Sequence, residues 1–80
     1  MANEKQIELL EKIEEAHKVC VYAYKCHLAD PENERKEQYW LNKESYMHGL
    51  LSAYRITYGR KLFACKDDIA FEIRLAKEIA

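Results

Sequence analysis

Apolar residues recur along most of this chain at the spacing of one face of an α-helix. Over residues 3–28 this spacing predicts a first helix. Its apolar arc consists of Leu10, Ile13, His17, Cys20, Val21, Tyr24 and Leu28. The opposite side begins charged and then carries a second apolar stripe of Val19, Tyr22 and Cys26. The end of this helix is therefore apolar nearly all round, and we expect it to be covered on two sides.

The segment "LADPENE" interrupts this pattern. Asp30 suits a helix N-cap and Pro31 suits the first helical position, so we predict a second helix over residues 31–58. Gly59 then suits the C-terminal cap, where the backbone turns left-handed. The apolar arc of the second helix is formed by Tyr39, Trp40, Tyr46, Met47, Leu50, Leu51, Ala53, Tyr54 and Tyr58. Two long helices of nearly equal length joined by a tight turn predict an antiparallel αα-hairpin.

A connector over residues 59–66 follows, and we expect Leu62 and Phe63 to anchor it. Asp67 is the predicted N-cap of a short last helix over residues 67–80. Its apolar stripe consists of Ile69, Ile73, Ala76, Ile79 and Ala80. The fold predicted for residues 1–80 is therefore a single all-α domain, a long hairpin with a short C-terminal helix, arranged as a three-helix bundle.

Composition supports helices and adds an expectation of self-association. Only two glycines and one proline occur among 80 residues, which disfavours a turn-rich β fold. A chain of this length forms only a small hydrophobic core of its own, and one short helix does not cover both apolar stripes of the first helix. We therefore predict a homo-oligomer, a dimer or larger. Its predicted interface consists of Val19, Tyr22, Cys26, Tyr39 and Tyr46.

The cysteines and histidines suggest neither a metal site nor a catalytic one. Three cysteines, an odd number without framework spacing, favour reduced thiols and a cytoplasmic protein, and we expect no signal peptide and no membrane span. His17, Cys20, Cys26 and His27 are residue types that zinc accepts. On one continuous helix, however, Cys26 points away from His17 and Cys20. We find no catalytic sequence motif, and we predict a protein that is not an enzyme and has no metal or cofactor.

Charge is distributed unevenly, although the formal net charge is −1. Between residues 41 and 66, Glu44 is the only carboxylate, and it stands one helical turn before His48. These two side chains can contact each other, and both are further candidate binding residues, with a solvated polar face as the alternative interpretation. The candidate binding residues of this basic region are Tyr54, Arg55, Tyr58, Arg60, Lys61 and Lys66. Three interpretations stay open. In the first, the tyrosines belong to the core and the cations offset the helix dipole. In the second, the patch contacts an acidic protein surface. In the third, it binds a nucleotide or a nucleic-acid backbone.

The run "ESYMHGLLSAYRITYG", residues 44–59, resembles segments of short helical proteins from bacteriophages and other mobile elements. The resemblance implies a small accessory or anti-defence role, in which the protein binds a host protein or sequesters a nucleotide signal without catalysis. We therefore predict a phage-type inhibitor that binds a host or defence protein through its Tyr, Arg and Lys patch. An oligomeric sponge for a phosphorylated nucleotide and a small DNA- or RNA-binding regulator are the alternatives. Helices this long do not fit a helix-turn-helix, which argues against nucleic acid.

Overall fold

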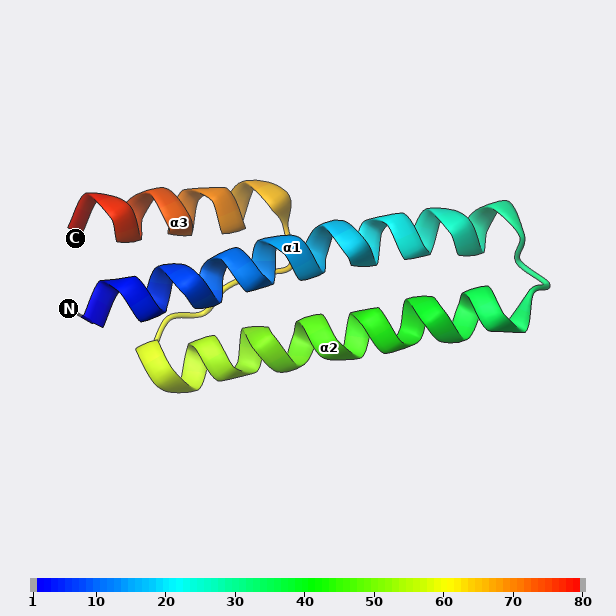
Figure 1. Ribbon diagram of the computed structural model, residues 1–80, viewed down its shortest axis with the longest axis horizontal. Coiled ribbons are helices and arrows are strands. Elements are labelled where there is room, and N and C mark those ends of the chain that lie inside the picture. Colours follow the sequence, from blue (N-terminus) through cyan, green and yellow to red (C-terminus); the bar gives the residue numbers. More distant parts are fainter. Residues whose placement is uncertain (1, 80) are drawn as a thin grey trace.

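Three helices make up the fold (Figure 1). The computed structural model describes the backbone of residues 2–79 and the side chains of residues 4–78. It contains α1 (Ala2–Ala29), α2 (Glu34–Tyr58) and α3 (Lys66–Ile79), and no strand occurs within residues 2–79. The two long helices run antiparallel and α3 lies beside α1 (Figure 1). The predicted all-α hairpin with a short third helix is thus confirmed. Within the same residues, no helix is long and apolar enough to cross a membrane.

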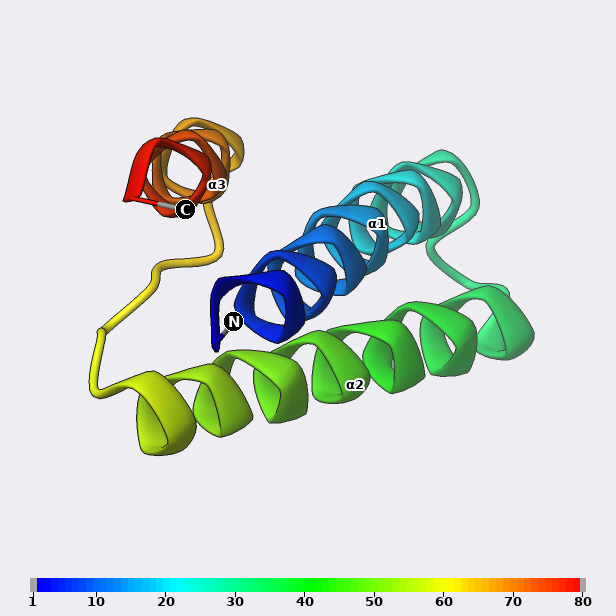
Figure 2. The ribbon, with the colours of Figure 1, turned by 60° about the vertical axis from the view of Figure 1, so that its left-hand side comes forward.

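The third helix covers only part of the hairpin. It packs on α1 and touches α2 through long side chains alone, so α1 lies between its two neighbours (Figure 2). With 14 residues against 28, and at about 1.5 Å per residue, α3 spans about half the length of α1. The other half of the hairpin extends as a two-helix arm, which contributes to the elongated dimensions of 47 × 20 × 17 Å.

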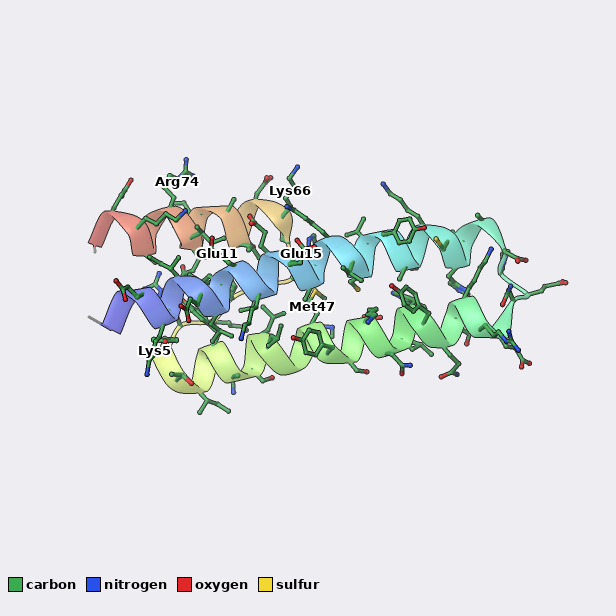
Figure 3. The ribbon with its side chains drawn as sticks, viewed as in Figure 1. Lys5, Glu11, Glu15, Met47, Lys66 and Arg74 are labelled. Atoms are coloured by element: carbon green, nitrogen blue, oxygen red, sulfur yellow. The ribbon has the colours of Figure 1, made fainter. Side chains whose placement is uncertain are left out.

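The core lies where α1 meets its two partners. Met47 projects from α2 toward α1, as Figure 3 shows, while Arg74 lies on the outer side of α3. The buried apolar residues are Leu10, Ile13, Ala16, Cys20, Ala23, Met47, Leu51, Tyr54, Leu62, Ile69, Ile73 and Ala76. The predicted stripe of the third helix is confirmed for its first three members, whereas Ile79 and Ala80 lie outside the side chains described. Leu62 anchors the connector as predicted, but Phe63 is 58% exposed and does not.

The distal part of the predicted arc on α1 is not core. Val21, Tyr24 and Leu28 are all exposed, although they continue the stripe that Leu10 and Ile13 begin. The reason is that α3 is short: it covers this side of α1 only as far as the middle of the hairpin (Figure 1). The prediction that these three residues are covered is therefore wrong for a single copy of the chain.

The turn between the long helices differs from the one predicted. Asn33, and not Asp30, is the N-cap of α2, since its Oδ1 accepts from the backbone amides of Arg35 and Lys36 at 3.0 and 3.3 Å. The amide of Asn33 donates to the carbonyl of Asp30 at 3.0 Å, which closes a turn with Pro31 at its second position. Proline favours that turn position as strongly as a helix start, so α2 begins three residues later than expected.

The other two helix boundaries follow local backbone chemistry. Gly59 ends α2 with φ of 67° and donates its amide to the carbonyl of Arg55 at 2.8 Å, which confirms the predicted cap. The last helix begins at Lys66 and not after Asp67, because the amide of Ile69 already donates to the carbonyl of Cys65 at 3.0 Å. The connector therefore covers residues 59–65.

Candidate functional site

The tyrosine at the centre of the predicted patch is part of the core. The side chain of Tyr54 is fully buried, so its prediction as a surface binding residue is wrong and the core interpretation holds for it. Its hydroxyl donates to Glu72 Oε2 at 2.7 Å and accepts from Gln6 Nε2 at 2.9 Å. Burial, followed by the hydrogen bond to Glu72, raises the pKa of Tyr54 to about 12. This phenol therefore serves to join all three helices.

Arg60 is occupied by the same carboxylate. Its Nε lies 2.5 Å from Glu72 Oε2 and its Nη2 lies 3.1 Å from Oε1, a two-point contact with a buried acid. The hydrogen bond from Arg60 is the main cause that lowers the pKa of Glu72, although burial opposes it. Arg60 therefore holds the connector on α3, which contradicts its prediction as a free binding residue.

Two further members of the predicted patch lie apart from the rest. Tyr58 is half-buried and packs on Tyr54, with ring centroids 5.1 Å apart, so it belongs to the edge of the core. Lys66 stands at the start of α3 (Figure 3). It lines a groove between α1 and α3 together with His17 and Lys18. Neither residue meets Arg55 and Lys61 on one surface.

Arg55 and Lys61 do come together, around a hollow between α2 and the connector. We call this hollow the basic groove; its volume is about 240 Å³. It is lined by His48, Leu51, Ser52, Arg55, Lys61, Leu62, Phe63 and Ala64. The α2 members stand one or two turns apart on one side of that helix, and the connector supplies the opposite wall. The Lys61 ammonium lies 5.2 Å from the centroid of the Phe63 ring, which keeps both side chains at the rim.

The predicted contact between Glu44 and His48 is confirmed. Glu44 Oε1 lies 3.6 Å from His48 Nε2, and both side chains remain partly exposed. Burial and then the charge of Glu44 raise the pKa of the Cys20 thiol, so Glu44 also lies near this core cysteine. His48 thus belongs to the basic groove, while Glu44 lies next to it.

The five residues predicted as an oligomer interface lie along one side of the hairpin, partly or largely exposed, and we call this side the tyrosine face: Val19, Tyr22, Cys26, Tyr39 and Tyr46. Val19 and Tyr46 line one shallow hollow across α1 and α2. A hydrogen bond with Cys26 is the main cause that raises the pKa of Tyr22, and Tyr39 adds to it, so these three side chains are neighbours. Tyr22 is 65% exposed and Tyr46 57% exposed.

The histidines and cysteines that zinc would accept are dispersed. Cys20 is buried, Cys26 lies on the tyrosine face, and His17 lines the groove between α1 and α3. The ring of His27 stacks on that of Trp40, with centroids 5.2 Å apart. Within the described residues, no group of three or more metal-binding side chains gathers.

Two important residues were missed from the sequence. Glu72 stands three positions after Ile69 and one before Ile73, at the margin of an apolar stripe. A carboxylate at such a position indicates a buried polar contact, because a buried charge needs a partner. Ser52 lies between His48 and Arg55 on the side of α2 that faces the connector. Its helical spacing from His48 was visible in the sequence, but the opposite wall of the groove was not.

No protein-family model, curated protein or solved structure matches this chain. The comparisons therefore add no residue role to those that the geometry defines.

Proposed function

We propose that this protein is a non-enzymatic helical module that acts by binding another protein at the basic groove. The observation that carries the proposal is the convergence of Arg55, Lys61 and His48 around one hollow. Exposed apolar side chains stand beside it: Phe63 at its rim and Ile56, which is 81% exposed, one turn after Ser52. Arginine and aromatic residues dominate binding hot spots, and the partner that fits is an acidic surface with an apolar centre.

On the resemblance of residues 44–59 alone, we extend this proposal to a phage-type inhibitor or accessory protein that acts on a host or defence protein. The same cations would also serve the two alternatives. A rise in melting temperature with cyclic or linear nucleotides would favour the nucleotide sponge. Duplex DNA binding that weakens steeply with salt would favour the regulator.

Affinity capture from the source organism with matched charge variants tests partner binding. The double variant Arg55→Glu, Lys61→Glu should lose the captured protein while its helical circular dichroism stays unchanged, because both side chains are exposed. Arg35→Glu is the control, since Arg35 is an exposed cation at the opposite end of α2. Capture that survives the double variant, or that Arg35→Glu abolishes equally, would refute a role for the groove.

We also propose that two copies of the chain associate through the tyrosine face. Tyr22, Tyr39 and Tyr46 expose large amphipathic rings on one side of the hairpin, away from the cover of α3. Tyrosine buries a large apolar area at low entropic cost and keeps a hydroxyl for hydrogen bonds, so such a face can pair with itself. The occupant that we assign to it is therefore a second copy related by a two-fold axis.

Sedimentation velocity or light scattering tests this association. The wild type should be a dimer at micromolar concentration, and Tyr22→Glu, Tyr46→Glu should be a monomer with the same helical content. Ile56→Glu changes an apolar residue of higher exposure that lies outside the tyrosine face, so it should leave the dimer intact. A wild type that is monomeric at high micromolar concentration would overturn the proposal.

A further inference from the structure

The basic groove holds cations that form no ion pair with the side chains of residues 4–78. Arg55 is exposed and forms no ion pair with any residue among 4–78, and the same is true of Lys61. Arg60 provides the contrast, since it comes from the same basic segment but is held by Glu72. Among residues 4–78, the ion-pair contact of Glu44 is with His48. Two permanently charged residues therefore line one small hollow, and neither pairs with a carboxylate among residues 4–78.

The geometry of the donors selects the kind of anion. The guanidinium of Arg55 offers parallel N–H groups in a plane, which suit two oxygens of one phosphate, and Lys61 adds a point charge from the opposite wall. Ser52 adds a hydroxyl donor, and the imidazole of His48, whose Nε2 lies 3.6 Å from Glu44 Oε1, adds its other ring nitrogen. Donors on several sides match the three terminal oxygens of a phosphate better than the two oxygens of a carboxylate.

The surroundings indicate that the phosphate is attached to a larger molecule. Phe63 provides an exposed apolar surface directly beside the groove, which an isolated inorganic ion would not use. The groove also lies at the C-terminal end of α2, where the helix dipole disfavours anions and weakens binding of phosphate by itself. Contacts made by flanking residues of a protein would compensate for that weakness.

We propose that the basic groove is a binding site for a phosphorylated side chain, such as phosphoserine, of the protein partner. This inference rests on the proposed function and adds the chemistry of the group that the partner presents. Arg55 and Lys61 hold the phosphate, Ser52 and His48 complete its hydrogen bonds, and Phe63 contacts the neighbouring peptide.

Nuclear magnetic resonance titration with three probes tests the site: inorganic phosphate, a short phosphoserine peptide with an apolar neighbour, and the same peptide unphosphorylated. At constant ionic strength, the phosphopeptide should bind at least about tenfold more tightly than inorganic phosphate, and the unphosphorylated peptide should not saturate. Shifts should centre on the Arg55 side-chain N–H and the amides of residues 61–64. Arg55→Gln and Lys61→Gln should each weaken phosphopeptide binding about tenfold, and the control Arg35→Gln should not.

Several outcomes would overturn the inference. These are equal binding of both peptides, saturation by inorganic phosphate without binding of the phosphopeptide, or equal loss with Arg35→Gln. Phosphatase treatment of the source extract separates this inference from the proposed function. If the partner is still captured in a groove-dependent way after its phosphate is removed, the phosphate site is wrong and the binding function stands. If no partner depends on Arg55 and Lys61, the proposed function itself fails.

Discussion

The hydroxyl of Tyr54 on α2 donates a 2.7 Å hydrogen bond to the carboxylate of Glu72 on α3, although these two helices do not otherwise pack on each other. The same carboxylate receives Arg60 from the connector, and the same hydroxyl accepts from Gln6 on α1. One buried acid and one buried phenol therefore link every described segment except the turn between α1 and α2. This small network sets the position of α3, and with it the position of the basic groove.

Removal of the Tyr54 hydroxyl should measure what the network contributes. Tyr54→Phe leaves the ring in place but deprives Glu72 of a donor and Gln6 of an acceptor, so we expect a loss of about 2 kcal/mol in the free energy of unfolding. Urea denaturation followed by circular dichroism would measure it. Tyr24→Phe, at an exposed position outside the tyrosine face, is the control and should change little. Equal losses for the two variants would contradict the role assigned to this hydrogen bond.

The carboxylate of Glu72 should make stability depend on pH in the acid range. Arg60 holds the pKa of Glu72 below its ordinary value of 4.5 in the folded chain. The charged form is thus favoured by folding, and its contribution is complete above the unfolded pKa and disappears as pH falls through the folded one. The difference in unfolding free energy between wild type and Glu72→Gln should therefore be largest near neutral pH and shrink below about pH 4. Glu8→Gln, at an exposed position, is the matched control variant.

Ionisation of Tyr54 should occur late in an alkaline titration. Its pKa is raised from 10.0 to about 12, so the neutral phenol is the form favoured by folding. Its contribution to stability is present below pH 10 and is lost as pH rises toward 12. Phenolate absorbance is followed against pH for the wild type and for Tyr54→Phe, and the difference between the two curves is the ionisation of Tyr54. A midpoint near 10 while the circular dichroism is still native would refute the assignment.

The two glycines should respond to alanine in opposite directions. Gly59 has a positive φ of 67°, so Gly59→Ala should destabilise the fold by about 1 kcal/mol through backbone strain. Gly49 lies inside α2 with open space around its Cα, so Gly49→Ala should stabilise it by about 0.5–1 kcal/mol through helix propensity. Thermal unfolding of both variants checks the pair, and a shift of the same sign in both would contradict this explanation.

The start of α2 should depend on Asn33 and much less on its neighbours. Asn33→Ala removes the side-chain oxygen that accepts from two backbone amides, and we expect a cost of about 1 kcal/mol. Glu32→Ala, at an exposed position of the same turn, is the matched control. Chemical denaturation measures both, and the cap assignment fails if the control loses as much stability as Asn33→Ala.

Local chemistry explains which features could be predicted from the sequence. The helical spacing of apolar residues, the Gly59 cap and the Ile69, Ile73, Ala76 stripe all depend on neighbours within a few positions along the chain. The start of α2 was misplaced because Pro31 is equally suited to a turn and to a first helical position, and only the hydrogen bonds of Asn33 decide between them.

The candidate site, by contrast, depends on contacts between residues distant in sequence. The cations of the basic segment look alike in the sequence, yet Arg60 is held by Glu72 and Lys66 lines another groove. Arg55 on α2 and Lys61 on the connector line the basic groove together. Likewise, no local sequence pattern predicts that α3 covers only half of α1 and leaves Tyr24 exposed. The sequence by itself therefore determined the helices and their apolar faces, because backbone preference and periodicity act locally. Only the tertiary structure decided which charges are free, since that depends on where the connector and α3 return to the hairpin.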